Sequence, residues 1–549
     1  MADSPSIEPF IRFGLLPENL PPVINSGSLW QHYEAHKGAY ILNKDCVGWL
    51  SPYDASKRGN QRRSFSISHP AFVYEQAAFF EKNWKDIGPL FARSPGSRSV
   101  PNFPKAGPRA TRITPHSELP AIRFRKLSRF KYCLVADVAR CFPSIYTHSV
   151  PWAIHGKSAS KSDTKTQSAT IFANRLDSAL RSAQDRQTMG IPVGPDTSRL
   201  TSEIVLSAVD AEFLKDAPTA ANAYIRHVDD YWIGAHTHEE AEAYLRALRH
   251  ALNSYELDVN ELKTRIVRLD TILGQKWPPE LKREIEYSFS SFMKSDEDLV
   301  SAFGAVIDFA NKNSDEGLIR HVIKTIDDGK SWNSEWEITE HFLAQSAVQF
   351  PHSLDYVARV IAWRVRSEMD VDRAMWVEVF RNAIVKASGL GRDSEVIWSL
   401  WALKELKSKI PKDLSSSICK NNNAISLAFL SHMHAGGLTN DKSIAQTLWD
   451  RVEGNSYSGP FWPLTLELQH LGIANSNAVT ANGAEAPLRA LHDSGMSLFD
   501  WLSGPAVFKK KGGKPNSAIE AYTSDYDDSD GMDDEDEDDH VDPGDFDYL

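Results

Sequence analysis

The sequence predicts an α+β domain in the N-terminal half of the chain, followed by an all-α domain that resembles a helical repeat. Two short apolar runs of strand type, at 131–138 and 227–234, are separated by stretches of helical periodicity at 169–186 and 199–214. This alternation is typical of an α+β layer. After about residue 290 the strand signal disappears, and amphipathic helices follow one another to about residue 471.

These patterns divide the chain into three segments. Residues 1–290 form the α+β part, residues 291–508 form the helical part, and residues 509–549 form a basic linker and a disordered acidic tail. A length of 549 residues also favours two or three domains over one. Pro351, the Gly389/Gly391 pair and Pro411 predict breaks between helices, and no signature recurs at a fixed period.

The composition fits a globular protein of a reducing compartment. Hydrophobic residues make up 42% of the chain, enough to build sizeable cores. The four cysteines lack C-x-x-C spacing, which argues against a disulfide framework and against a structural zinc site. Because no signal peptide and no run of about 18 apolar residues is found, we expect a cytoplasmic protein with no membrane partner.

Charge is distributed very unevenly along the chain. The net charge of −12 comes from the tail, because residues 525–549 contain 14 acidic and no basic residues. Residues 57–131 instead contain 16 Lys and Arg against four acids, a pattern that favours binding to a polyanion. A solvated basic face without a ligand is the alternative for this block. The tail is either a solubilising segment or a nucleic-acid mimic that competes for the basic block.

Three carboxylates stand at the ends of predicted strands. Asp229 and Asp230 interrupt the apolar run RHVDDYWIG, and Asp137 follows the run YCLVA. Acids placed at a strand end and at a hairpin turn can converge on two Mg²⁺ ions about 4 Å apart, which clamp the attacking and leaving oxygens of phosphoryl transfer. Such ions also explain how adjacent like charges are tolerated.

The order of several motifs resembles that of reverse transcriptases. DVARCF begins at Asp137, GIPVGPDTS covers 190–198, HVDD covers 227–230 and NELKT covers 260–264, like motifs A to D of that family. The resemblance extends over about 130–275, and LGQKW at 273–277 is similar to the motif E turn. GLLPENLPPV at 14–23, SFSISHP at 64–70 and FPSIYTHSVPWAIHGK at 142–157 are similar to the abortive-infection and defence-associated reverse transcriptases of bacteria.

The resemblance implies right-hand fingers and a palm, a C-terminal helical domain, and a set of site residues. Asp137, Asp229 and Asp230 match the catalytic, metal-ligating acids, and we add Val138, the residue after Asp137, to the metal site. Lys263 matches a lysine that protonates the pyrophosphate leaving group. The expected nucleotide-binding residues are the aromatic gate against a 2′-hydroxyl, the Gly and Ser of motif B, and fingers cations, namely Phe142, Gly194, Ser198, Arg112, Arg123, Arg125 and Lys126.

The sequence departs from the family at three positions. His227 stands where motif C usually begins with Tyr or Phe, and an imidazole ordinarily titrates near pH ~6–7. Val193 and Arg199 replace the Gln and Pro that flank the Gly and Ser of motif B. These departures predict a changed positioning of the primer and a looser hold on a template base.

The function predicted by this resemblance is a Mg²⁺-dependent DNA polymerase of a bacterial anti-phage system, with Mn²⁺ as a substitute metal. It adds dNTPs to a 3′-hydroxyl or to a protein hydroxyl, and relatives either copy a non-coding RNA or work without a template. We expect nucleic acid as a partner and a homo-oligomer as the assembly. The alternative is a catalytically degenerate scaffold that binds nucleic acid through its helical domain, which is either an extension of the thumb or a clamp.

Overall fold

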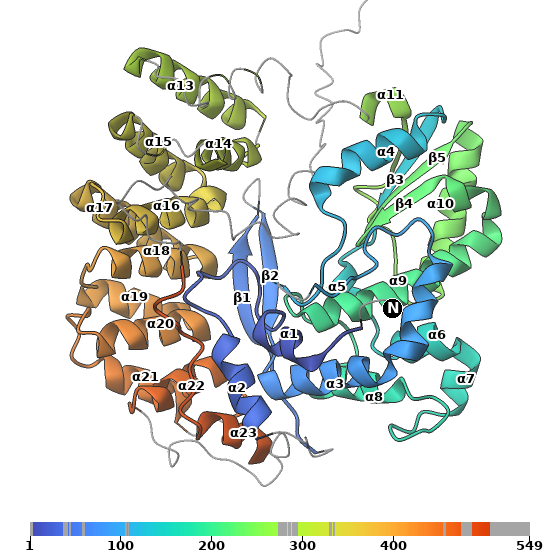
Figure 1. Ribbon diagram of the computed structural model, residues 1–549, viewed down its shortest axis with the longest axis horizontal. Coiled ribbons are helices and arrows are strands. Elements are labelled where there is room, and N and C mark those ends of the chain that lie inside the picture. The colour runs from blue at the N-terminus through green and yellow to red at the C-terminus, as the bar shows by residue number, and fades with distance from the viewer. Residues whose placement is uncertain are drawn as a thin grey trace, which may run out of the picture.

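The computed structural model describes residues 4–504 except for 37–41, 43–44, 58–60, 105–106, 108, 273–282, 284–286, 288–294, 314, 329–331, 333–334, 454–456 and 474–485. Figure 1 shows a mixed α/β half with a sheet on one side, a stack of helices on the other side, and a β-hairpin between them. The predicted order of an α+β part followed by helices is confirmed. None of the helices within these residues is both long and apolar enough to cross a membrane.

The central sheet has four antiparallel strands in the order β4-β5-β3-β6. Their bounds are Tyr132–Asp137 for β3, Tyr224–His227 for β4, Asp230–Ala235 for β5 and Arg265–Arg268 for β6. The run predicted at 131–138 is therefore β3, and the run at 227–234 is the turn of the β4–β5 hairpin with most of β5. The carboxylates lie at the strand ends, as the sequence predicts.

The two faces of the sheet pack against different helices, because successive strand residues point to opposite faces. Leu134, Tyr231 and Ile233 belong to the core that also contains residues of α9 (Asp196–Asp216) and α10 (His238–Asn253). On the other face, Cys133 and Trp232 pack with residues of α4 (Leu119–Leu127). Asp137 and Asp230 are in phase with these two residues, so they lie on the α4 face.

Further elements of the N-terminal half surround the sheet. The predicted helix at 169–186 is shorter than expected, since α8 begins only at Asn174 and ends at Ser182. The remaining helices here are α1 (Ile7–Arg12), α2 (Gly27–Ala35), α3 (Pro70–Ile87), α5 (Cys141–Ser144), α6 (Ser149–His155), α7 (Lys157–Ser162) and α11 (Leu269–Ile272). The hairpin of β1 (Ser51–Ser56) and β2 (Arg62–Ile67) forms a separate antiparallel sheet.

The C-terminal half is helical throughout its described residues. The helices are α13 (Asp296–Lys312), α14 (Gly317–Asp328), α15 (Trp336–Gln349), α16 (Leu354–Arg366), α17 (Arg373–Ser388), α18 (Asp393–Glu405), α19 (Lys412–Asn421), α20 (Ala424–Ala435), α21 (Ile444–Val452), α22 (Trp462–His470) and α23 (Ala486–His492). The breaks predicted at Pro351, at the Gly389/Gly391 pair and at Pro411 all fall between helices.

The β1–β2 hairpin is joined to the helical half by a shared core and by polar contacts. Tyr53, Phe65 and Ile67 belong to the same buried cluster as the helices from α13 to α22. Arg62 binds Glu395 of α18 through two hydrogen bonds of 2.5 and 3.0 Å. The division at residues 290 and 291 falls outside the described residues and stays a prediction. The structure adds that the first 73 residues pack largely with the helices.

Candidate active site

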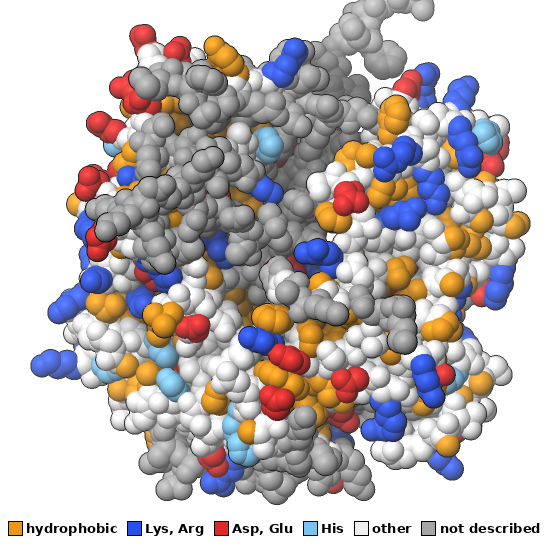
Figure 2. All heavy atoms as spheres, viewed as in Figure 1, with side chains coloured by type: hydrophobic (Ala, Val, Ile, Leu, Met, Phe, Trp, Pro, Cys, Tyr) orange, Lys and Arg blue, Asp and Glu red, His pale blue; other side chains and the backbone are white. Residues whose placement is uncertain are grey.

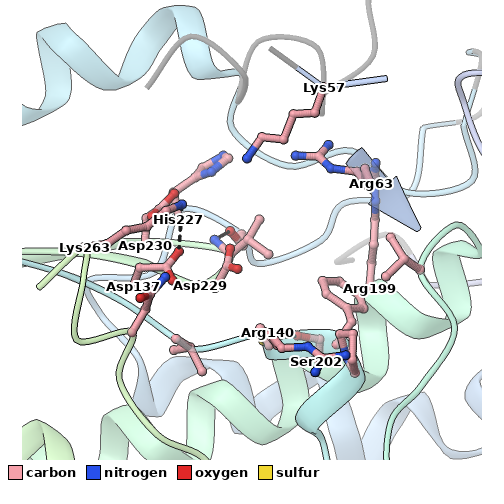
Figure 3. Close-up of a pocket in the computed structure, with 18 of the residues that line it drawn as sticks. Lys57, Arg63, Asp137, Arg140, Arg199, Ser202, His227, Asp229, Asp230 and Lys263 are labelled. Carbon is pink, nitrogen blue, oxygen red and sulfur yellow. Dashed lines mark hydrogen bonds and ion pairs between the residues drawn. The ribbon is translucent and has the colours of Figure 1, made fainter. Parts of the chain in front are cut away.

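The three predicted carboxylates meet at one edge of the central sheet. Asp137 ends β3 and is the direct partner of Asp230 in the β3–β5 register. Asp229 lies in the two-residue turn between β4 and β5, and its carbonyl oxygen accepts a hydrogen bond of 3.1 Å from the Val138 amide. All three acids line one cavity of about 360 Å³ together with Val138, as Figure 3 shows for the acids.

The turn that carries Asp229 is held in an unusual backbone conformation. Val228 has a φ of 51°, which lies in the left-handed region that a β-branched side chain strongly disfavours. The hydroxyl of Ser99 accepts a hydrogen bond of 2.6 Å from the Val228 amide, and the Arg226 guanidinium donates one of 3.0 Å to the Val228 carbonyl. Two side chains from outside the hairpin turn therefore fix its shape.

Arg226 belongs to a buried network beneath this turn. Its side chain is fully buried and bridges two acids of α9, with bonds of 2.8 and 2.9 Å to Glu203 and of 2.8 Å to Asp210. Tyr231 donates a further bond of 2.7 Å to Asp210. Burial opposes the charge of Arg226, but Asp210 and Glu203 outweigh it and hold the pKa of the guanidinium well above its usual value. Sequence reasoning missed this network, because nothing in RHVDD indicates that Arg226 points inward.

Lys263 reaches the acids from the loop between α10 and β6. Its Nζ lies 3.7 Å from Oδ2 of Asp137 (Figure 3). The loop is tied to the end of β3, since the Asn260 amide donates to the Asp137 carbonyl at 2.7 Å and the Ala139 amide donates to the Asp258 carbonyl at 2.9 Å. The predicted neighbourhood of Lys263 and the acids is therefore found in the structure, and its role in proton transfer stays a prediction.

Cations line the wall of the cavity opposite the acids. Lys57 and Arg63 come from the β1–β2 hairpin, and Figure 3 shows both side chains pointing into the cavity. Arg140 follows Asp137 by three residues and adopts a left-handed φ of 46°. Lys57 and Arg140 were missed by sequence reasoning, although Arg140 lies within the DVARCF motif. A cavity with acids on one side and cations on the other suits a substrate that carries both a metal and phosphates.

The donor set of the cavity fits a hard divalent cation. Three carboxylates provide the oxygen ligands that Mg²⁺ prefers, and Asp137 is 13% exposed, so an ion can reach it. Within the described part of the chain no three His, Cys, Asp or Glu side chains are already drawn together as a metal site. Val138 lines the same cavity and stays a prediction as a ligand, as do the three acids.

The predicted nucleotide-binding residues of motifs A and B differ in their positions. Phe142 is the second residue of α5 and lines the cavity. Ser198 is fully buried in α9, and Gly194 is not among the lining residues. Gly194 has a φ of 133°, and a Cβ there would lie 3.1 Å from Pro17 of the N-terminal segment. The glycine thus allows a close approach of two chain segments, and the nucleotide roles of all three residues stay predictions.

The four predicted fingers cations lie outside the lining of this cavity. Arg112 is exposed beside the cavity wall, whereas Arg123, Arg125 and Lys126 belong to α4. Arg123 lies over the ring of Trp232 at 5.0 Å, and Lys126 lies over the ring of Tyr224 at 5.6 Å. The basic residues that do line the cavity are Lys57, Arg62, Arg63, Arg140, Arg199 and Lys263.

The expectation that His227 titrates near neutral pH is wrong for this environment. His227 is buried, and burial lowers its pKa to about 4. Its Nε2 donates a hydrogen bond of 2.8 Å to the Thr114 carbonyl, and its ring packs edge-on against His116 at 4.0 Å. The neutral ring therefore acts as a packing element next to the acids.

Ion pairs join motif B to the N-terminal segment. Arg199 binds Glu18 at 2.5 Å and lies 3.7 Å from Asp196. Asp196 is fully buried, and it accepts hydrogen bonds from Arg109 and from the backbone amides of Ala110 and Thr111 at 2.8 and 3.1 Å. Arg199 is thus part of a structural ion-pair cluster. The residues of the predicted motif E turn, 273–277, lie outside the described residues.

The sheet end with three acids and a lysine lies within a segment that matches a known family. Residues 93–290 match the family model described as "Reverse transcriptase (RNA-dependent DNA polymerase)". This segment is a reverse transcriptase domain, and domains of this class polymerise nucleotides. The match covers fewer than half of the 549 residues.

Neither the curated proteins nor the solved structures identify a similar protein that bears on function. No curated protein matches the chain. Among the matching solved structures is telomerase from Candida tropicalis in complex with a TWJ fragment of telomeric RNA, at 10% identity and a TM-score of 0.27. That alignment covers 73% of this chain and 65% of the telomerase chain, and a likeness at this score carries no argument about function.

Proposed function

We propose that this chain is a Mg²⁺-dependent DNA polymerase of the antiviral reverse transcriptase type, which acts in bacterial defence against phage. The observation that carries the proposal is the cavity in which Asp137, Asp229 and Asp230 face Lys57 and Arg63. The resemblance of the motifs to abortive-infection enzymes supports the defence role. The buried network under Asp229 supports an active centre over a degenerate scaffold, because scaffolding gives no reason to fix this turn.

In the proposed reaction a 3′-hydroxyl, or a protein hydroxyl at initiation, attacks the α-phosphorus of a dNTP. The bond between the α-phosphorus and its bridging oxygen breaks, pyrophosphate leaves, and the hydroxyl loses its proton. Asp137 and Asp229 would hold divalent ions, which when bound neutralise charge on the attacking and leaving oxygens. Lys57 and Arg63 would bind the triphosphate, and Lys263 would give a proton to the pyrophosphate.

The packing of motif B supports synthesis without a template. The resemblance implies that the motif B glycine leaves a bare backbone that the nucleotide or the template base can approach. Here the Gly194 carbonyl accepts a bond of 2.8 Å from Arg109, and Pro17 covers the glycine. We therefore favour template-independent synthesis over copying of a non-coding RNA.

The test is dNTP incorporation by the purified protein with Mg²⁺, before and after complete RNase treatment. Wild-type protein should form product from single dNTPs in both samples, and product that depends on intact RNA would contradict the template-independent mode. Replacing Asp229 and Asp230 by Ala should lower synthesis by roughly a thousandfold, about 4 kcal/mol of transition-state stabilisation. Asp270→Asn, an exposed acid of α11, is the matched control and should keep full activity.

The defence role is tested in bacteria that express the same variants. Wild-type protein and Asp270→Asn should reduce phage plaque formation, and the Asp229/Asp230 double variant should not. If the double variant still protects cells, the chain acts as a nucleic-acid-binding scaffold through its helical domain. Synthesis in vitro without any protection would confine the proposal to the enzymatic activity.

A further inference from the structure

A basic surface outside the cavity lies on α4 and the residues that follow it. It consists of Arg123, Arg125, Lys126, Arg129 and Lys131, here called the α4 basic surface. No Asp or Glu occurs anywhere between residues 119 and 136. Figure 2 shows Lys and Arg side chains gathered over α4 and mixed with hydrophobic ones. None of the five lines the cavity, so nucleotide binding leaves this surface unexplained.

Aromatic rings lie between these cations. Phe124 is 58% exposed, although a phenyl ring at a helix surface gains nothing from contact with water. Arg123 lies over Trp232 at 5.0 Å and Arg129 lies over Phe130 at 5.0 Å. A surface that alternates cations with rings is the arrangement that binds single strands, since phosphates pair with the cations and bases stack on the rings.

Four of the five cations of this surface keep their charge without a carboxylate partner among the described residues. Among the residues that the structure describes, Lys126 and Arg129 form no ion pair with a carboxylate, and the same holds for Arg125 and Lys131. Partial burial, followed by the nearby charges of Arg98 and Arg129, lowers the pKa of Lys126 to about 8. An approaching phosphate would relieve this repulsion.

The α4 basic surface and the catalytic acids belong to the same face of the sheet. Trp232, which touches Arg123, follows Asp230 by two residues along β5. Residues two apart point to the same face and lie roughly 7 Å from each other. Trp232 is buried beneath α4, so α4 covers the sheet face next to Asp230. A strand whose end is at Asp230 therefore meets α4 within one or two nucleotides.

We propose that the α4 basic surface binds the growing DNA strand behind its 3′-hydroxyl, as a product track on the catalytic face of the sheet. This inference rests on the proposed polymerase function. It assigns the α4 cations to the backbone phosphates of the product, in place of the triphosphate of the incoming nucleotide. Phe124 stacks on a base of that strand.

The test compares a triple variant with a matched control. Arg125→Gln, Lys126→Gln and Arg129→Gln remove three charges from the α4 basic surface, while Lys82→Gln, Lys85→Gln and Lys161→Gln remove three exposed charges from α3 and α7. Binding of fluorescent oligo(dT) of about 12 nucleotides is measured in EDTA by anisotropy at several salt concentrations. The α4 variant should bind at least tenfold more weakly. The slope of log affinity against log salt should fall by about two, as expected for three lost phosphate contacts.

Kinetics with the same proteins separate the product track from a nucleotide site. The α4 variant should extend a dinucleotide primer normally and a 12-nucleotide primer poorly, with an unchanged KM for the dNTP. Unchanged oligo(dT) affinity, a raised KM for the dNTP, or a loss confined to oligo(rU) would overturn the inference. Because binding is measured in EDTA, a wild-type protein that shows no synthesis contradicts the proposed function without obscuring the result for α4.

Discussion

Single residues at the catalytic edge show how strain and charge are balanced. Val228 adopts a backbone conformation that costs about 1–3 kcal/mol for a β-branched residue. Arg226 donates a hydrogen bond to the Val228 carbonyl, and the Val228 amide donates one to Ser99. These two bonds hold Val228 in this conformation and direct Asp229 toward the cavity. Arg226 in turn keeps its place through Glu203 and Asp210. The position of the Asp229 carboxylate thus depends on a guanidinium that does not line the cavity.

We predict that Arg226→Met destabilises the protein by about 3–5 kcal/mol, because it leaves Glu203 and Asp210 buried without their counter-charge. Arg226→Lys keeps the positive charge but not the planar guanidinium that binds both acids. It should therefore lower the free energy of unfolding less than Arg226→Met does, but still lose most DNA synthesis. Urea unfolding measures the first effect, and amide hydrogen exchange at residues 228–231 measures the loosened turn.

Arg320→Met is the control for this prediction. Arg320 is also buried and binds Asp355 at 3.0 Å, but it lies in the helical half. The control should lose comparable stability and retain protected amides at 228–231. Equal exchange in both variants would show that Arg226 has no specific role in the turn.

Phe142 makes a second prediction at this scale. If its ring excludes the 2′-hydroxyl, Phe142→Val should raise the ratio of ribonucleotide to deoxyribonucleotide incorporation by at least about tenfold, an energy near 1.4 kcal/mol. Steady-state kinetics with rATP and dATP provide the measurement. Ile113→Val, another apolar residue of the cavity lining, should leave the ratio unchanged. A constant ratio in both variants would remove the gate from the proposed mechanism.

Among the elements, the β1–β2 hairpin depends most on its neighbours. It supplies Lys57 and Arg63 to the cavity, yet its other face is bound to α18. The amides of Asp54 and Ser56 donate to the side chains of Asp393 and Ser394 at 2.9 and 3.0 Å. A helix of the C-terminal half therefore positions part of the basic wall of the cavity.

Asp393 should make the stability of this contact depend on pH. Burial raises its pKa to about 6 in the folded protein, above the ordinary value of an aspartate. The folded state binds this proton more tightly than the unfolded state does. The charged carboxylate therefore lowers the free energy of unfolding above pH 6. The protein regains this stability as the pH falls toward 4. The wild type should therefore gain roughly 2 kcal/mol over this window relative to Asp393→Asn.

Thermal unfolding of both proteins at several pH values measures this difference. Buried histidines such as His352 and His492, whose pKa values burial lowers, destabilise both proteins alike as pH falls. The comparison between variants therefore isolates Asp393. Parallel curves for the two proteins between pH 4 and 7 would contradict the prediction.

The sequence predicted the helices and strands better than it predicted the tertiary contacts between them. Strand periodicity located β3 and β5, and proline and glycine located the helix breaks, because these signals are local. The acids could be predicted to converge since they end adjacent strands. The direction of Arg226, the placement of α4 over the catalytic face and the burial of His227 depend on tertiary packing, which no local pattern encodes. For this reason three of the four cations predicted to bind the nucleotide, Arg123, Arg125 and Lys126, lie on α4, and Lys57 was missed.

At the scale of the whole molecule, the first and the last described segments meet. The Asn25 amide donates to the Leu498 carbonyl, and the Asp500 amide donates to the Val23 carbonyl, both at 2.8 Å. A single buried cluster contains residues from Ile11 to Phe499. The helices therefore support the β1–β2 hairpin, while Ile7 and Val193 pack against both this cluster and the separate core of the central sheet.

We predict that the protein unfolds in one thermal transition, because the N-terminal segment packs into both the helical core and the core of the central sheet. Cleavage within 288–294 followed by separation of the fragments should leave an N-terminal piece without a stable hairpin. Calorimetry of the intact chain and circular dichroism of the isolated fragment test this. Two separate transitions, or a fragment that melts cooperatively at the same temperature as the intact chain, would contradict it.

The meeting of residues 23–25 with residues 498–500 also has a consequence during translation. While a ribosome is still making the helices, the nascent chain already contains Asp137, Asp229 and Asp230 but lacks α18, which binds the β1–β2 hairpin. A prematurely terminated polypeptide therefore lacks the support on which the basic side of the cavity depends. Under the proposed function, such a polypeptide would make no DNA.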